Sequence, residues 1–412
     1  MRHIKIVDAR MGRGKSSAAI RYMNENKGKR CFLYITPYLA EVDRVSTLCD
    51  FDEPGKDCAS KLSHLKSLMR KQKNIASTHA LFTMMDEEAL ALAEENGYSL
   101  IIDEAIPVVD IVSISRQDLE IMMDSLVDDD EDGGLHWRDP AYTGLFSNYK
   151  KMADEGVLRH CSGSVFSMLN PKKFLYFDEV IMMTYLFGGQ MQKVYFDYFG
   201  FTYDIVGIVK DDEGFMFSDK PDEPEPVDYS ALISIIGEGR CSEWERKMND
   251  IGKGRTALSS SWYISRGKEH EDVCTLRCNL RNFFERKTKS GTKDRLWTTF
   301  KGNESWLLGQ RGRFASNFLA LNTRATNEYR DTSTVAYLVN RFINPNIMKF
   351  FSSKGFKLNQ DQFALAEMLQ FIWRSAIRDD KPITVYIPSQ RMRKLLVNWI
   401  EEMNTGKEEK AA

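Results

Sequence analysis

The fold of this chain is decided by residues 3–20, which read HIKIVDARMGRGKSSAAI. Among the first six of these residues, Ile4, Ile6 and Val7 give a pattern typical of a short buried strand. Gly12 and Gly14 then favour a tight turn, and a helical pattern follows from Lys15 to Asn26. The stretch therefore predicts a strand, a glycine-containing turn and a helix in direct succession.

The turn, Ala9–Ser16, fits the phosphate-binding P-loop pattern with alanine in place of the first glycine. Its glycines let backbone N–H groups converge on phosphate oxygens, and the helix N-terminus favours the same anion. We expect Lys15 to reach the β- and γ-phosphates of ATP and Ser16 to bind Mg²⁺. The other residues expected to bind the nucleotide are Gly12, Arg13, Gly14 and Ser17. A simple glycine-rich turn is the alternative, but the flanking strand and helix are the context that the motif requires.

An acidic pair, Asp103 and Glu104, ends the apolar strand pattern of Leu100–Ile102. In the Walker B arrangement, Asp103 would hold Mg²⁺ through water and Glu104 would polarise the attacking water. An isolated Asp-Glu pair after a strand is more often a helix cap. In a parallel sheet, however, both motifs would lie at the same edge, where ligands bind.

The composition describes a globular chain without membrane segments. Of its 412 residues, 42% are hydrophobic and 28% charged, and no apolar run is long enough to span a bilayer. The seven scattered cysteines suit a reduced compartment, so we expect a cytoplasmic protein with no membrane partner. His270, Cys274 and Cys278 lack a second ligand pair, and we interpret them as structural rather than zinc-binding.

Strand patterns alternate with helical patterns along both halves of the chain, which predicts two tandem α/β domains. We expect the first at residues 1–205 and the second at 231–412, joined by an acidic linker or loop at 206–230. A helical, acidic insertion is expected at about 107–171, with the run 128–132 as a solvated loop. In the second half we expect strands at Thr256–Tyr263, Ser316–Leu321, Thr334–Phe342 and Ile383–Ile387, and helices at Phe363–Arg378 and Arg391–Glu402.

Charge is distributed unevenly although the formal net charge is only −2. Residues 240–313 contain 17 lysines and arginines against 9 acidic residues. Such a basic segment can bind phosphates of a nucleic acid, whereas a solvated surface is the alternative. Aromatic residues interleave with these arginines, an arrangement that suits single strands. Of the aromatic residues, we expect Trp262 to be buried, and Tyr329 and Arg330 to be exposed.

Taken in order, eight segments resemble the motifs of superfamily 2 helicases of the DEAD/DEAH type, and the second half is similar to bacteriophage-encoded members. The segments that resemble motifs I, Ia, Ib, II, III, IV, V and VI are Ala9–Ser16, Thr36-Pro37, Thr78–Phe82, Asp103–Ala105, Met183–Phe187, Leu258–Tyr263, Asn322–Arg330 and Gln370–Arg378. Trp373 stands where motif VI usually has glycine, and motif III reads Met-Thr-Tyr rather than Ser-Ala-Thr.

The resemblance implies two RecA-like P-loop domains and assigns further residues. Gln370, Arg374 and Arg378 would act in catalysis, the two arginines as fingers on one helical face. The residues that would contact the nucleic acid are Thr36, Pro37, Thr78, His79, Ser260, Arg324, Thr326, Asn327, Tyr329 and Arg330.

The leading hypothesis is a nucleic-acid-dependent ATPase that acts as a helicase or translocase. Single-stranded or partly duplex DNA would be the partner, RNA is possible, and phage replication or recombination with its proteins would be the setting. The alternatives are a packaging-type DNA translocase without strand separation, a nucleic-acid-binding module with a vestigial ATPase, and a small-molecule kinase. The intact Lys15, Ser16, Asp103 and Glu104 argue against the vestigial ATPase.

Overall fold

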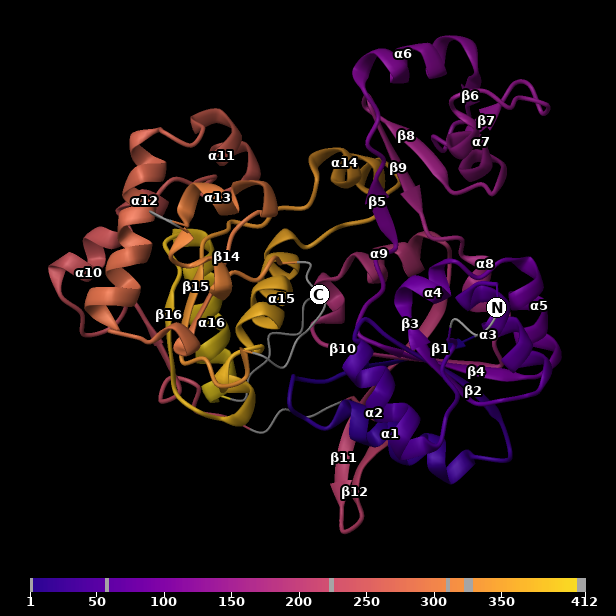
Figure 1. Cartoon of the computed structure of the whole chain (residues 1–412), viewed down its shortest axis with the longest axis horizontal. Helices are drawn as coiled ribbons and strands as arrows, with labels where there is room; N and C mark the ends of the chain where they lie inside the picture. The colour runs from indigo at the N-terminus through magenta and orange to yellow at the C-terminus, as the bar shows by residue number, and fades with distance from the viewer. Residues whose placement is uncertain (1–2, 56–58, 222–225, 309–311, 322–328, 406–412) are drawn as a thin grey trace. The chain divides into compact units, whose positions relative to one another are not determined.

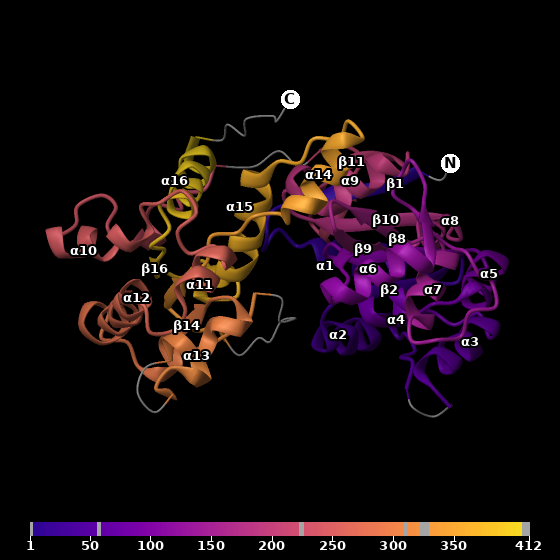
Figure 2. The same cartoon turned by 90° about the horizontal axis from the view of Figure 1, so that it is seen from above.

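The computed structural model describes residues 3–55, 59–221, 226–308, 312–321 and 329–405. The chain forms two compact units (Figure 1 and Figure 2). The first unit comprises residues 1–9, 14–221 and 343–359, and the second comprises 10–13, 222–342 and 360–412. Among the described helices, none is both long enough and apolar enough to cross a bilayer.

A seven-stranded sheet forms the centre of the first unit, in the order β12-β11-β1-β10-β4-β2-β3. All neighbouring strands are parallel except the β11–β12 hairpin. The strands are β1 (His3–Asp8), β2 (Cys31–Thr36), β3 (Ile75–Thr78), β4 (Tyr98–Asp103), β10 (Glu179–Thr184), β11 (Thr202–Asp211) and β12 (Gly214–Ser218). The predicted apolar runs are therefore the central strands, which parallel sheets bury on both faces.

Helices cover both faces of this sheet (Figure 1). On one face, α1 (Lys15–Asn26) and α2 (Leu39–Cys49) share a core with the strands and with Phe215 of the hairpin. On the other, α4 (His79–Thr83), α8 (Lys172–Leu175) and α9 (Met191–Tyr198) are joined by packed aromatic rings. The first unit also contains α3 (Lys61–Arg70) and α5 (Glu87–Glu95).

The segment between β4 and β10 has its own small core and is mixed rather than helical. It contains β5 (Val109–Ile111), α6 (Arg116–Ser125), β6 (Val127–Asp129), β7 (Leu135–Trp137), α7 (Ser147–Asp154), β8 (Leu158–Cys161) and β9 (Ser164–Met168). The strands form an antiparallel sheet, β5-β9-β8, and a hairpin, β6-β7. The expectation of a helical insertion missed them because strands of three to five residues are too short for an alternating pattern to stand out.

One helix of the first unit, α14 (Pro345–Ser353), comes from the second half of the chain. It lies beside β8 and β9 (Figure 1). The Phe350 ring packs edge-to-face on Phe166 of β9 at 4.9 Å between centroids. Asn346 Nδ2 donates to Ser164 Oγ at 2.6 Å, and just beyond the helix Lys354 pairs with Asp132 at 2.5 Å. Helix α14 and Lys354 therefore contact the segment between β4 and β10 through aromatic packing, a hydrogen bond and an ion pair.

The second unit is built on a parallel sheet in the order β13-β16-β15-β14. Its strands are β13 (Ile233–Ile235), β14 (Arg295–Thr298), β15 (Thr334–Tyr337) and β16 (Ile383–Tyr386). Its helices are α10 (Glu243–Met248), α11 (Ser260–Arg266), α12 (Glu271–Asn282), α13 (Glu304–Leu307), α15 (Gln360–Ile372) and α16 (Gln390–Thr405). The predicted strand at Ile383–Ile387 and the C-terminal helix are confirmed, whereas the strand expected at Thr334–Phe342 forms but ends at Tyr337.

Four expectations about elements are wrong. Thr256–Tyr263 is a turn that leads into α11, because the Ser259 side chain caps that helix. Ser316–Leu321 contributes only a single bridge between Phe318 and Trp297 after a 3-10 turn. The helix expected at Phe363–Arg378 ends at Ile372. Residues 206–218, expected within the linker at 206–230, form the end of β11, the turn and β12 of a hairpin.

Candidate functional site

The P-loop segment forms the predicted turn between β1 and α1. Gly12 and Gly14 have φ angles of 82° and 81°, in the left-handed region that glycine tolerates best. Gly14 is the N-cap of α1, so Lys15 and Ser16 occupy its first turn. The Lys15 ammonium donates to the carbonyl oxygen of Ala9, across the turn. The Lys15 amine, which we expect to bind the phosphates, therefore contacts the backbone of the same turn that would surround them.

Asp103 ends β4 as a buried carboxylate, 6% exposed. Its Oδ2 accepts hydrogen bonds from Tyr34 Oη at 2.9 Å and from Thr36 Oγ1 at 3.5 Å. Burial, with a smaller contribution from the neighbouring Glu104 charge, raises the pKa of Asp103 to about 7. The Tyr34 hydrogen bond and Lys15 oppose that rise. A cation bound here would favour the charged carboxylate further.

Glu104 lies one residue beyond the strand and has a left-handed backbone, with φ at 65°. Its N–H donates to the Met183 carbonyl of β10 at 2.9 Å, and its carboxylate accepts from Tyr38 Oη at 2.6 Å. A left-handed non-glycine residue costs about 1–3 kcal/mol and is common at functional sites. The strand end and the Tyr38 hydroxyl thus hold this carboxylate in one position.

The strand order brings these motifs to one edge of the sheet. β1, β10, β4 and β2 are adjacent and parallel, so their carboxyl ends coincide, with β10 between the P-loop strand and the Asp103 strand. Gln190 is buried at this edge and donates to Thr184 Oγ1 of β10 at 2.5 Å. Thr184 also accepts the Ala9 N–H through its carbonyl, at 3.1 Å.

Sequence reasoning missed Tyr34, Tyr38 and Gln190. The signal for the two tyrosines is their spacing: Tyr34, Thr36 and Tyr38 alternate along β2 and the residues just after it, next to β4. Alternate residues of a strand share a face, so a hydroxyl at each position can reach the carboxylates on the neighbouring strand. Gln190 lies in the turn after β10, close to Thr184 in sequence, but no motif of the sequence marks it.

The predicted nucleic-acid residues of the first half follow β2 and β3 at the same edge. Thr36 and His79 are buried, at 0% and 1% exposure, and Thr36 points to Asp103. The expectation that Thr36 and His79 contact a nucleic acid stays a prediction, and in this structure both side chains are buried. Pro37 and Thr78 are half-buried, and Thr78 also caps α4 by accepting from Leu81 N–H.

The predicted residues of the second half lie in several places. Arg324, Thr326 and Asn327 fall outside the described residues. Tyr329 is half-buried, so the expectation that it is exposed is wrong, whereas Arg330 is exposed as expected and pairs with Asp379 through two hydrogen bonds of 2.6 Å. Ser260 is exposed at the start of α11, and Trp262, expected to be buried, is 6% exposed.

Gln370, Arg374 and Arg378 do not share a helical face. Gln370 lies in α15, Arg374 follows its end, and Arg378 is in a 3-10 turn, Ala376–Asp379. The expectation of one face is wrong because the backbone of Ser375 is extended, which interrupts the helical register. Gln370 and Arg374 are half-buried and Arg378 is exposed.

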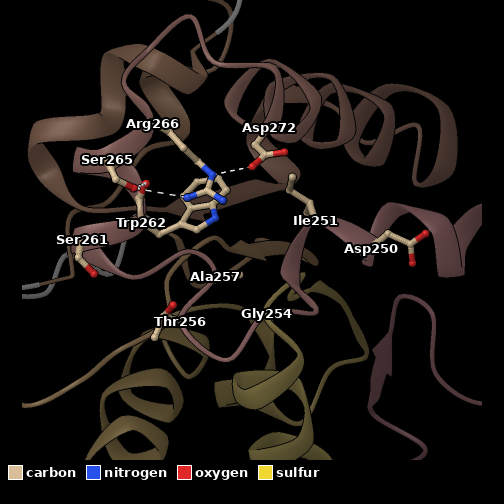
Figure 3. Close-up of a pocket in the computed structure, with 10 residues that line it drawn as sticks. All are labelled: Asp250, Ile251, Gly254, Thr256, Ala257, Ser261, Trp262, Ser265, Arg266 and Asp272. Carbon is tan, nitrogen blue, oxygen red and sulfur yellow. Dashed lines mark hydrogen bonds and ion pairs between the residues drawn. The ribbon is translucent and has the colours of Figure 1, made fainter.

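The second unit contains an open cavity of about 500 Å³ beside α11 (Figure 3). Arg266 reaches across it, with its guanidinium 4.6 Å from the centre of the Trp262 ring and its Nε 2.5 Å from Asp272 Oδ2. The lining residues are Asp250, Ile251, Gly254, Thr256, Ala257, Ser261, Trp262, Ser265, Arg266 and Asp272. Ser261 and Trp262 belong to the segment that resembles motif IV.

A family model described as the YonV C-terminal Rossmann-like domain matches residues 239–400. The SPbeta prophage-derived protein YonV of Bacillus subtilis strain 168 is 36% identical over 417 residues, which cover 97% of this chain and 99% of that protein.

Among solved structures, one described as XPD_APO has a TM-score of 0.49 and 12% identity, covering 96% of this chain and 95% of that chain. The S. tokodaii Xpd4 structure has a TM-score of 0.46 and 13% identity, covering 96% and 94%. The DUF1998 helicase MrfA, bound to DNA and AMPPNP, has a TM-score of 0.37 and 11% identity, covering 97% of this chain and 48% of that one.

Proposed function

This chain belongs to the family of the prophage-derived protein YonV, and for it we propose the function of an ATP-hydrolysing helicase or translocase that acts on DNA. The observation that carries the proposal is the edge of the first-unit sheet. There the P-loop turn follows β1, the buried Asp103 ends β4 and Glu104 comes directly after it, and both strands run parallel to β10, which lies between them. Nucleotides bind at the carboxyl ends of such strands.

The residues at this edge fit a magnesium-bound nucleotide. Mg²⁺ prefers oxygen ligands, and the Asp103 carboxylate and the Ser16 hydroxyl would hold it. Gly12, Arg13, Gly14 and Ser17 would surround the phosphates, which the absence of Cβ atoms at both left-handed glycines permits. When bound, the cation neutralises charge that develops on the transferred phosphoryl group.

Each catalytic side chain has a distinct task. Lys15 would leave the Ala9 carbonyl and bind the β- and γ-phosphates. Glu104 would orient and polarise the attacking water while Tyr38 holds its carboxylate in place. Gln370, Arg374 and Arg378 of the second unit would bind the γ-phosphate and supply positive charge during transfer.

DNA is the substrate that the motif resemblance favours, single-stranded or partly duplex, with RNA possible. Pro37, Thr78, Ser260 and Arg330 are the described residues with exposed or half-buried side chains that would contact it. Arg324, Thr326, Asn327 and Tyr329 complete the proposed set. A role in phage replication or recombination would follow, as would a cytoplasmic location in the host. The second candidate is a DNA translocase of the packaging type, which moves along DNA without separating strands.

ATP turnover measured with and without single-stranded DNA tests the function directly. We expect stimulation by the strand, and loss of turnover in Lys15→Ala, which removes the charge on the phosphates. Turnover near the wild-type rate in folded Lys15→Ala, checked by circular dichroism, would contradict the P-loop assignment. Unwinding of a tailed duplex then separates the two candidates, because only a helicase releases the strand.

A further inference from the structure

We propose that the β11–β12 hairpin of the first unit forms the subsite for the base of the bound nucleotide, and that this base stacks on the Phe215 ring. The inference rests on the proposed function and extends it to the half of the nucleotide that the P-loop does not hold. The ligand class is a purine nucleotide, because a purine has a larger ring system for stacking than a pyrimidine.

The strand order determines the direction in which the nucleotide would lie. Asp103 and Glu104, which would act at the γ-phosphate and its cation, follow β4 on one side of β1, with β10 between the two strands. β11 and β12 lie on the other side of β1. A nucleotide whose terminal phosphate points toward Asp103 therefore directs its ribose and base toward the hairpin.

The hairpin extends beyond β1 at the edge of the sheet where the nucleotide would bind. β11 is paired with β1 up to Val206, which is opposite Val7, and it continues to Asp211 before the chain returns as β12. Figure 1 shows the hairpin beside α1, the helix that follows the P-loop. Within this extension Phe215 is directly opposite Lys210. The hairpin therefore presents both side chains next to the P-loop helix.

Phe215 contacts the residue at which the P-loop helix begins. Its ring fills the space beside Gly14, the N-cap of α1, since a Cβ atom added to Gly14 would lie 2.4 Å from two of the ring carbons. The ring is only half-buried, and the ammonium of the exposed Lys210 lies over it, 5.6 Å from its centre. A charged ammonium keeps contact with water, so this face of the ring is open to solvent. A base can replace the ammonium there and stack.

Contacts with α1 hold the hairpin in place. Arg21 donates to Asp211 at 2.7 Å and to Glu213 at 2.9 Å, on either side of the hairpin turn. The rings of Tyr22 and Phe217 pack with their centroids 5.6 Å apart. The stacking ring is thus positioned before a nucleotide arrives, which lowers the entropic cost of binding.

The test compares ADP with inorganic pyrophosphate, which lacks the base and the ribose, by isothermal titration calorimetry with Mg²⁺ present. Phe215→Ala should weaken the binding of ADP about fivefold or more, the lower end of what base–aromatic stacking contributes. The affinity for pyrophosphate should stay near the wild-type value, because the phosphate contacts are unchanged. GDP should lose as much affinity as ADP, since a phenyl ring has no donor or acceptor that reads the edge of a base.

ATP turnover gives a second readout of the same variant. Stacking holds the base equally in the ground state and in the transition state. Phe215→Ala should therefore raise KM for ATP and leave kcat near the wild-type value.

Two variants of β12 serve as controls. Phe215→Tyr keeps an aromatic ring and should bind ADP nearly as well as the wild type. Met216→Ala changes the neighbouring side chain, which is exposed, and should leave the affinities for ADP and pyrophosphate unchanged. Circular dichroism checks the fold of each variant, and retained pyrophosphate binding shows that the P-loop itself is intact.

The outcomes separate the base subsite from the proposed function. Equal losses of ADP and pyrophosphate affinity in Phe215→Ala would overturn the subsite, because the ring would then only support the P-loop backbone. Unchanged ADP affinity in this variant would overturn it as well. In both cases ATP turnover by the wild type would leave the proposed function standing. A wild-type chain that binds neither ADP nor pyrophosphate and hydrolyses no ATP would overturn both.

Discussion

Single hydroxyl groups on β2 and just after it determine the environment of Asp103 and Glu104. Tyr34 and Thr36 bind Asp103, and Tyr38 binds Glu104, so one alternating row supports two carboxylates. The motif pattern identified Asp103 and Glu104 because their chemistry requires adjacent acids after a strand. It did not identify the tyrosines, because a role for their hydroxyls can be inferred only when the strand that lies next to them is known.

Tyr38→Phe should lower kcat by about tenfold or more and leave KM for ATP nearly unchanged. The reason is that Glu104 would lose the 2.6 Å hydrogen bond that fixes it and would orient water poorly. Steady-state kinetics with separate kcat and KM values provide the measurement. The Glu104→Gln variant gives the largest loss of kcat for comparison, because it should still bind ATP but almost lose turnover.

Tyr22→Phe serves as the matched control, because Tyr22 is bonded to Glu179 away from the acidic pair. It should leave kcat within about twofold. An equal loss of kcat in Tyr22→Phe would indicate a general effect on the first unit, and an unchanged Tyr38→Phe would show that Glu104 needs no such support.

Whole elements were predictable where hydrophobic burial alone decides them. β1, β2, β4 and β10 are largely buried, and several apolar residues mark each of them in the sequence. Thr256–Tyr263, which we expected to be a strand, is instead a turn and the start of a helix, because the Ser259 cap and the Asn340 hydrogen bonds favour them. Local sequence propensity therefore predicted the wrong element where a side chain distant in sequence donates hydrogen bonds to the backbone.

The contacts of Glu245 at the start of α10 predict that the free energy of unfolding depends on pH. Glu245 closes a capping box with Ser242 and pairs with Lys287, and these contacts lower its pKa to about 2. A lowered folded pKa stabilises the fold above the unfolded value near 4.5, and this contribution is lost as pH falls toward 2. Glu245→Gln should therefore lower the free energy of unfolding by about 1–3 kcal/mol at pH 7 and by progressively less below pH 4.5.

Denaturant unfolding followed by tryptophan fluorescence measures this difference, because six of the seven tryptophans lie in the second unit. Glu243→Gln is the control: Glu243 is on the same helix but 81% exposed, so its effect should stay within about 0.5 kcal/mol. A Glu245→Gln difference that is constant between pH 7 and pH 3 would rule out the ionised carboxylate as its source.

At the scale of the molecule, the two α/β sheets were predictable from alternating patterns, whereas the path of the chain between them was not. Residues 343–359 follow a strand of the second unit yet pack in the first. Nothing in a helical pattern states which core the helix joins, because an apolar face fits any complementary surface.

The uneven charge of the chain predicts salt-dependent strand binding through the second unit. Arg281 and Arg286 are exposed within the basic segment 240–313. Arg281→Gln combined with Arg286→Gln should reduce the slope of log affinity against log salt by up to about 1.4, since each phosphate contact contributes about 0.7. Removing two exposed first-unit charges, Lys29→Gln with Lys71→Gln, should leave that slope unchanged. A flat salt response in the wild type would exclude the basic segment from the binding surface.

The origin of α14 limits how this protein can be divided into fragments. A cut at residue 221 would place α14 on the C-terminal fragment, although Phe166, Ser164 and Asp132, which it contacts, stay on the N-terminal one. Each piece would then expose apolar surface, Phe166 and Tyr198 on one and Phe350 and Phe351 on the other. Soluble expression of the N-terminal piece should therefore improve when a peptide spanning residues 343–359 is supplied in trans.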